Sequence, residues 1–327
     1  RGGILRRGLA VERAEAALIT NIAEDHFGEF GVYDLASLAE AKLVVARALD
    51  AESPLILNAD DPTLVRLAPA TGRPITWFSL DAAHPLIIAA AVRGESAVTV
   101  ENAQVTILER GQREAVIRTA DVPITLGGAA RHNVSNALGA VALARKLGLS
   151  IAAIAEGLRR FQGTALENPG RLNVFDLGGA RVIVDFAHNP HGMRALVELA
   201  VTFPAKRRLV ILGQAGDRDD DAIRELARST WPLGPDRIIL KEMEKYLRGR
   251  DPGEATGILA EEFRRLGAAE GTMSQANTEL EAVREALAWA RQGDLLLLPL
   301  HSQREEVLVL LGRMHASGWS PGSCVPE

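Results

Sequence analysis

Acidic, imidazole and amide side chains follow an apolar run near the start of the chain. Residues 17–28 (ALITNIAEDHFG) begin with aliphatic residues and then bring Glu24, Asp25 and His26 together. This pattern is typical of a buried strand that ends in a polar turn, and open α/β sheets bind ligands where their strands end. The three groups could hold a divalent cation, position a phosphate, or form a solvated loop, and their spacing alone does not separate these interpretations.

Lys42 follows His26 by sixteen residues, within residues 34–50, where apolar residues recur with helical spacing. A helix packed back on the sheet would return Lys42 to the end of the strand. An unpaired buried ammonium group is costly. Lys42 would therefore meet a phosphate or a carboxylate, or become a carbamate that binds metal. The alternative is a lysine that lies along the helix edge with its ammonium group in water.

Two asparagines open an alanine-rich helical segment at residues 131–136 (RHNVSN). Asn133 and Asn136 are nearly one helical turn apart, so both can face the same ligand. A side-chain amide offers a donor and an acceptor, which suits the edge of an adenine ring. The alternative is that Asn133 is an ordinary N-cap of the helix.

Residues 185–192 (DFAHNPHG) are the counterpart of the opening stretch in the second half of the chain. Asp185, His188 and Asn189 end a strand, and Pro190 starts a helix whose exposed amides favour an anion. Asp185 could accept a hydrogen bond from a ribose hydroxyl, orient a lysine, or hold a cation. The alternative is a well-capped loop between strand and helix.

Two further stretches follow later strands. Gly213 and Gly216 allow a tight turn. Arg248 and Arg250 could bind carboxylates or phosphates bidentately, or belong to a solvated loop. The phosphate-loop pattern GxxxxGK[ST] and the dinucleotide fingerprint GxGxxG are both absent from the sequence.

The elements that must position these residues alternate between strand and helix. This alternation predicts two consecutive doubly wound, mostly parallel α/β domains. Residues 85–126 contain short β-branched runs, which predict an antiparallel appendage. Turn residues at 163–170 mark a boundary between domains at 1–165 and 166–327. The expected strands are 17–19, 53–60, 75–79, 85–92, 97–100, 104–109, 115–118, 172–176, 180–185, 208–212, 237–240 and 294–298, and the expected helices are 34–50, 133–147, 151–161, 193–201, 221–229, 253–266, 278–291 and 305–314.

The composition limits the class of protein. The 327 residues have a net charge of -5, so there is no basic footprint for nucleic acid. No apolar run is long enough to span a membrane, so we expect no membrane partner. Cys324 is the single cysteine, which excludes an internal disulfide and suits a reducing cytoplasm. Because the chain starts at Arg1 within a stretch typical of a domain interior, we expect it to be part of a longer protein.

Taken in order, eight motifs resemble the Mur ligase family of ATP-dependent amide-bond-forming enzymes, and the opening RGGIL points to the cyanophycin-forming branch of that family. The resemblance spans nearly the whole chain. The motifs are residues 1–8 (RGGILRRG), 20–26 (TNIAEDH), 57–62 (LNADDP), 132–136 (HNVSN), 169–171 (PGR), 185–191 (DFAHNPH), 216–218 (GDR) and 246–253 (YLRGRDPG).

The resemblance implies a Mur ligase central domain followed by a Rossmann-like C-terminal domain. It also implies a reaction in which ATP phosphorylates a carboxylate and an amine displaces phosphate. In the cyanophycin branch the amine is the α-amine of arginine, and the carboxylate is an aspartate side chain of the polymer. The implied cofactors are ATP and Mg2+.

The roles of single residues are likewise implied by the resemblance. His26 would bind Mg2+, and Lys42 would be the lysine that is carbamylated and metal-binding in several members. Asn133 and Asn136 would contact adenine. The remaining implied roles belong to the second domain: Arg171 and Asp185 would contact the nucleotide, and His188, as a catalytic residue with His26 and Lys42, would line the interdomain cleft with Asn189.

One departure from the family pattern limits these expectations. The family's phosphate loop, and the magnesium-binding glutamate just before RGG, would lie upstream of Arg1. We therefore expect this polypeptide alone not to turn over ATP. Two alternatives stay open: another Mur-type amino-acid ligase, and a non-catalytic remnant that binds nucleotide or a partner. The family also implies an upstream ATP-grasp domain and makes a homo-oligomer plausible.

Overall fold

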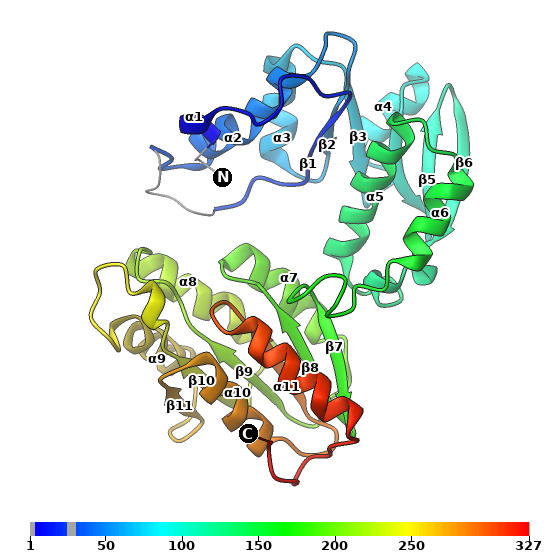
Figure 1. The fold of residues 1–327 in the computed structure, drawn as a ribbon. Coiled ribbons are helices and arrows are strands. Elements are labelled where there is room, and N and C mark those ends of the chain that lie inside the picture. The colour runs from blue at the N-terminus through cyan, green and yellow to red at the C-terminus, as the bar shows by residue number, and fades with distance from the viewer. Residues whose placement is uncertain (1–3, 25–30, 327) are drawn as a thin grey trace. The chain divides into compact units, whose positions relative to one another are not determined.

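The structure is a computed structural model that describes residues 4–24 and 31–326. The chain forms two compact units, Arg1–Gln162 and Gly163–Glu327. Within the described residues, each unit is built on one six-stranded sheet with helices packed against it (Figure 1). The predicted mostly parallel α/β architecture with an antiparallel appendage is confirmed.

The sheet of the first unit follows the chain in the order β1-β2-β3-β4-β5-β6. The first four strands are parallel, and β4, β5 and β6 form an antiparallel meander. The strands are β1 (Ala17–Ile19), β2 (Leu55–Asn58), β3 (Ile75–Ser79), β4 (Ala97–Glu101), β5 (Gln104–Glu109) and β6 (Gln112–Arg118). The α-helices are α1 (Ile4–Arg7), α2 (Leu35–Leu43), α3 (Pro62–Leu67), α4 (Pro85–Arg93), α5 (Arg131–Lys146) and α6 (Ile151–Arg160), with short 3-10 helices at Val44–Ala48, Ala68–Thr71, Thr119–Asp121 and Pro123–Thr125.

Both faces of this sheet are buried, and this explains the continuous apolar runs of its parallel strands. Successive side chains of a strand point to opposite faces. Leu55 and Leu57 accordingly join the core that contains α2, α3 and α4, whereas Ile56 joins the core that contains α5 and α6.

Residues 85–92 form helix α4, and our prediction of a strand there was wrong. The β-branched isoleucines suggested a strand, but the local signals are helical. His84 caps the helix by accepting from the amide of Leu86 at 3.2 Å, and Pro85 occupies the first turn. Gly94 ends the helix with a left-handed φ of 69°, and Ile87 and Ala90, three residues apart, face the core.

The sheet of the second unit has the order β11-β10-β9-β12-β8-β7 and is parallel except for the hairpin of β7 and β8. The turn of this hairpin contains Gly178 and Gly179, both at positive φ. The strands are β7 (Asn173–Leu177), β8 (Ala180–Asp185), β9 (Arg208–Leu212), β10 (Arg237–Lys241), β11 (Met273–Ala276) and β12 (Leu295–Pro299). The helices are α7 (Pro190–Ala200), α8 (Asp220–Thr230), α9 (Glu254–Leu266), α10 (Glu279–Trp289) and α11 (Arg304–Ala316), with 3-10 turns at Trp231–Leu233 and Glu244–Tyr246.

Strand β11 is the element of this unit that the sequence pattern did not predict. Its sequence MSQA lies at the edge of the sheet and is only partly buried, so it lacks an apolar run. The other strands of the second unit coincide closely with the apolar runs. None of the helices among the described residues is long and apolar enough to cross a membrane.

Candidate functional site

Three side chains hold the backbone where it leaves β1 in the first unit. The amide of Asn58 donates to the carbonyl of Thr20 at 3.0 Å. The ammonium group of Lys42 donates to the carbonyl of Asn21 at 3.0 Å. The amide of Ile22 donates to the carboxylate of Asp61 at 2.6 Å. Three consecutive residues are therefore tied to β2, to α2 and to the N-cap of α3.

Asp61 has two tasks at once. Besides accepting from Ile22, its carboxylate caps α3 by accepting from the amides of Thr63 at 2.9 Å and Leu64 at 3.0 Å. Asp61 is buried. We had not predicted these contacts of Asp61. The motif at residues 57–62 could have indicated them, because its Asn58 and Asp61 are the residues that bind the backbone at the end of β1.

Lys42 returns from α2 to the end of β1, as its spacing predicted. Its bond to a backbone carbonyl lies in a partly buried position, so the lysine does not simply extend into water. Asp25 and His26 lie outside the described residues. Among the residues that the structure describes, no cluster of three or more His, Cys, Asp or Glu side chains could hold a metal ion. The roles of His26 and Lys42 in metal binding stay predictions.

Asn133 and Asn136 lie together at the start of α5. The N-cap of this helix is Ala130, so the interpretation of Asn133 as an ordinary cap is wrong. Instead, the amide group of Asn133 donates to the carbonyl of Ile124 at 2.8 Å. Its side-chain oxygen faces the amide group of Asn136 at 3.4 Å. Asn133 is half-buried and anchored, whereas Asn136 is exposed. The pair can present one anchored and one adjustable amide to a ligand.

Asp185 ends β8 and is paired with a backbone amide. Its carboxylate accepts from the amide of Leu172 at 2.9 Å. Burial raises the pKa of Asp185, against the opposing effects of the Leu172 amide and the positive charge of Arg171. The guanidinium group of Arg171 lies 5.1 Å from the ring centre of Phe186. The structure thus brings Arg171 and Asp185 together at one strand end.

His188 and Asn189 follow in the loop between β8 and α7. The Nδ1 atom of His188 lies 3.0 Å from the carbonyl oxygen of Phe186, and the two rings are 5.2 Å apart. The side-chain oxygen of Asn189 caps α7 by accepting from the amide of Gly192 at 2.8 Å. Helix α7 begins at Pro190, as predicted. Asn189 therefore uses its oxygen for the helix, which fits the capped-loop alternative.

Gly213 and Gly216 do not adopt the left-handed conformation that we associated with a tight turn. Instead, the absence of a side chain at each glycine lets another segment of backbone approach closely. A Cβ at Gly213 would lie 2.5 Å from the carbonyl oxygen of Lys241, and one at Gly216 would lie 1.9 Å from that of Leu247. Gly213 lets the loop after β9 pack against the end of β10, and Gly216 lets it pack against the chain that follows β10.

Arg250 joins these same two loops. Its guanidinium group donates to the carbonyls of Gly216 at 3.1 Å and Arg218 at 2.7 Å, and forms an ion pair with Asp220 at 2.8 Å. Arg248 is paired with Asp217. Arg250 thus serves as a brace between loops. Both arginines bind carboxylates of the protein itself, Arg248 that of Asp217 and Arg250 those of Asp220 and Glu254, which agrees with carboxylate binding as one of the interpretations that we had left open.

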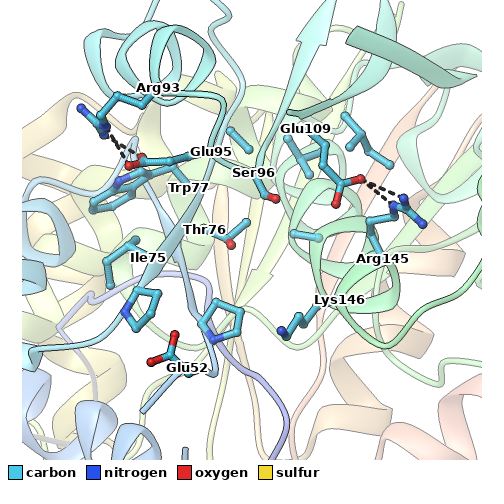
Figure 2. A pocket seen from close by; sticks show the side chains of 16 residues that line it. Glu52, Ile75, Thr76, Trp77, Arg93, Glu95, Ser96, Glu109, Arg145 and Lys146 are labelled. Atoms are coloured by element: carbon cyan, nitrogen blue, oxygen red, sulfur yellow. Dashed lines mark hydrogen bonds and ion pairs between the residues drawn. The ribbon is translucent and has the colours of Figure 1, made fainter. Parts of the chain in front are cut away.

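A separate cavity of about 690 Å³ lies at the opposite edge of the first sheet, where β2, β3 and β4 begin (Figure 2). Ion pairs of Arg93 with Glu95 and of Arg145 with Glu109, each 2.8 Å long, line it (Figure 2). None of the site residues predicted from the sequence contributes to this cavity. Of the predicted residues that the structure describes, Lys42 reaches the end of β1 and Asp185 ends β8, and strand ends are where such sheets bind ligands.

Two family models match the chain. The Mur ligase middle domain matches residues 6–144, and the glutamate ligase domain of Mur ligases matches residues 170–299. The chain is 35% identical to the cyanophycin synthetase of Synechocystis over 259 residues, which are 79% of this chain and 29% of that protein. It is 32% identical to the UDP-N-acetylmuramate–L-alanine ligase of Bordetella avium over 293 residues, 86% of this chain and 59% of that protein.

The chain thus spans 29% of the length of that cyanophycin synthetase. Among solved structures, it is similar to Escherichia coli FolC in complex with ADP, with a TM-score of 0.64, 21% identity, and coverage of 94% of this chain and 66% of that one. It is also similar to MurF from Acinetobacter baumannii, with a TM-score of 0.62, 21% identity, and coverage of 92% and 60%. These two likenesses concern the fold alone. The two domain matches, in order along one chain, show that this protein belongs to the Mur ligase family.

Proposed function

We propose that the chain is part of an ATP-dependent ligase that adds arginine to aspartate side chains of cyanophycin. The observation that carries this proposal is the 35% identity to cyanophycin synthetase across 79% of the chain. The geometry supports it, because Lys42 reaches the end of β1, Asp185 ends β8, and Asn133 and Asn136 lie together at the start of α5. The substrates would be ATP, arginine and an aspartate-containing polymer or peptide.

In the proposed reaction, an oxygen of the aspartate carboxylate attacks the γ-phosphorus of ATP, and ADP leaves. The α-amine of arginine then attacks the acyl phosphate carbon, and phosphate leaves with the carboxylate oxygen. Most of the catalysis in such a phosphoryl transfer comes from positioning and electrostatic stabilisation. Bound Mg2+ would supply charge neutralisation at the phosphoryl oxygens.

The described residues would bind and orient the substrates. Asn133 and Asn136 present two amides that suit an adenine edge. Asp185 and Arg171 lie together and would contact the nucleotide from the second unit. Lys42 would act beside the phosphoryl group, either as an ammonium or as a carbamate. His188 and Asn189 would line the side of the amine substrate.

A second Mur-type activity is the specific rival. The UDP-N-acetylmuramate–L-alanine ligase of Bordetella avium is 32% identical over 86% of the chain, which is nearly as similar. The two activities differ in both substrates. A single assay that offers each pair of substrates in turn therefore separates them.

The test measures ADP release by the full-length protein. We expect ADP with ATP, arginine and an aspartate polymer, and none with ATP, L-alanine and UDP-N-acetylmuramate. The reverse pattern would establish the rival. Nucleotide binding without ADP release under either condition would indicate a non-catalytic remnant.

A variant pair tests the adenine contact. Asn136→Ala removes an exposed amide at the proposed adenine edge, and loss of one hydrogen bond predicts a KM for ATP that is about 5- to 10-fold higher. Asn277→Ala is the control, because Asn277 is also exposed and lies in a loop far along the chain. An equal effect of both changes would contradict the assignment.

A further inference from the structure

Three ionisable side chains form a buried cluster beneath the strand ends of the second unit. Lys241 ends β10, Glu279 begins α10, and His301 follows β12. The side chains of Lys241, Glu279 and His301 are 0%, 1% and 6% exposed. Charges buried to this degree are costly unless each is paired and hydrogen-bonded. The partners of these three side chains therefore show which parts of the backbone the cluster fixes.

The ammonium group of Lys241 has a partner for each of its three donors. It forms an ion pair with the carboxylate of Glu279. It donates to the carbonyl of Pro299 at 2.5 Å and lies 3.2 Å from the Nδ1 atom of His301. Lys241 reaches these groups from β10, although β9 lies between β10 and β12.

Gly213 provides the room for this crossing. It directly follows β9, and a Cβ there would lie 2.8 Å from the Cγ of Lys241 as well as 2.5 Å from its carbonyl oxygen. The glycine after the middle strand thus lets the lysine stem pass across. This second, independent observation links the loop after β9 to the cluster.

Glu279 organises the chain after β12. Its carboxylate accepts from the amides of His301 at 2.8 Å, Ser302 at 3.1 Å and Gln303 at 2.9 Å. Three consecutive amides and an ammonium group therefore surround one carboxylate. This arrangement fixes the backbone of residues 301–303 and places the imidazole ring of His301.

The ring of His301 connects this arrangement to the loop that carries His188 and Asn189. Since Nδ1 faces the ammonium group of Lys241, it must be the acceptor, and Nε2 must carry the proton. That Nε2–H donates to the carbonyl of Ala187 at 3.0 Å. Burial, together with the nearby charge of Lys241, lowers the pKa of His301 well below its usual value, so the neutral ring is the form that fits these contacts.

We propose that His301, held by Lys241 and Glu279, is a positioning residue that sets the loop of residues 186–189 for the ligase reaction. The catalytic part of this inference rests on the proposed function. His301 acts through the carbonyl of Ala187 and thereby orients His188 and Asn189, which are its neighbours in the loop. A displacement of about 1 Å at such a site can cost about 100-fold in rate.

Two substitutions distinguish the hydrogen bond from His301 to Ala187 from the packing of the imidazole ring. In His301→Gln the amide nitrogen takes the place of Nε2 and can still donate to Ala187. In His301→Asn the side chain takes the place of Nδ1, so it can accept from Lys241 but cannot reach Ala187. Both remove the ring. We therefore expect similar melting temperatures for the two variants of the full-length protein.

Two measurements then test whether His301 positions the loop. By hydrogen-exchange mass spectrometry, residues 186–192 of His301→Asn should exchange at least 10-fold faster than in the unchanged protein, and those of His301→Gln within about 3-fold. For arginine-dependent ADP release, kcat/KM of His301→Asn should fall about 10- to 100-fold, and that of His301→Gln less than about 5-fold. Equal exchange in both variants, or equal kcat/KM, would overturn the proposal.

The two proposals fail in different ways. If the unchanged full-length protein releases no ADP, the proposed function fails, whereas the exchange comparison still tests whether His301 holds the loop. If both variants fail to fold, long-range 1H–15N correlation spectra of the unchanged protein replace them. The neutral Nε2–H tautomer of His301 is required, and an imidazolium or an Nδ1–H tautomer would overturn the proposal.

Discussion

Replacement of Asp61 should loosen the first unit at the point where β1 ends. The side chain holds two elements, because one oxygen accepts from the amide of Ile22 and the other caps α3. Ile22 is itself buried, so its amide would lose its partner without gaining water. The two functions can be removed separately, because serine is a good N-cap but is too short to span both contacts.

The expected losses follow from these contacts. In Asp61→Ser, the buried amide of Ile22 is left unsatisfied, which costs about 1–3 kcal/mol of unfolding free energy. In Asp61→Ala, the cap is lost as well, which adds about 1 kcal/mol. Asp34→Ala is the matched control, because Asp34 caps α2 in an exposed position without a second contact to another strand.

The assay is urea unfolding of the full chain followed by hydrogen-exchange mass spectrometry. This readout resolves residues 1–162 from residues 163–327, which need not unfold together. The order of stability should be unchanged protein, then Asp61→Ser, then Asp61→Ala. The reasoning is refuted if Asp61→Ser is as stable as the unchanged protein, or if Asp61→Ala loses no more than Asp34→Ala.

Four further predictions follow from single contacts. Gly213→Ala should lower the unfolding free energy of the second unit by about 1–3 kcal/mol, because its Cβ would overlap the backbone and stem of Lys241; unchanged urea unfolding would contradict this. Asp185→Asn should raise the melting temperature at pH 7. The pKa of Asp185 is raised in the folded protein. Protonated Asp185 therefore contributes to stability below the pKa of the unfolded chain, and this contribution is lost as the pH rises through the pKa of the folded protein. The gain should shrink towards pH 4, and a gain independent of pH would count against this cause. The lowered pKa of His301 has the opposite effect. Neutral His301 contributes to stability above the pKa of the unfolded chain, about 6.5, and this contribution is lost as the pH falls towards the pKa of the folded protein. The melting temperature of the unchanged protein should therefore fall faster than that of His301→Gln between pH 7 and 5, and parallel curves would argue otherwise. Residues 1–327 alone should not release ADP, because the sequence contains no GxxxxGK[ST] pattern; measurable turnover would refute this.

The sequence predicted those features that local chemistry determines. The caps at Asp34, Asp61 and Ser150 are features of this kind, because a cap needs only a short polar side chain before a helical pattern. The return of Lys42 to the end of β1 followed from the spacing of one strand-to-helix unit. The apolar runs marked the buried parallel strands for the same reason, since both of their faces are covered.

The features that the sequence did not predict depend on distant parts of the chain. Lys241 and Glu279 are separated by 38 residues, and nothing local to either one indicates the other. The requirement for Gly213 comes from a lysine on a neighbouring strand rather than from its own turn. Strand β11 was not predicted, because its position at the edge of the sheet leaves it partly exposed and its sequence is polar. Helix α4 was misjudged because β-branched residues were weighted above Pro85 and Gly94, which mark its two ends.

The proposed function requires that the full-length protein activates a carboxylate as an acyl phosphate and joins it to arginine. The most direct measurement uses an aspartate polymer labelled with 18O in its side-chain carboxylates, together with ATP and arginine. We expect one 18O atom per amide bond to appear in inorganic phosphate, and arginine to enter the polymer in equal amount. Transfer of 18O to AMP, or phosphate without label, would contradict it.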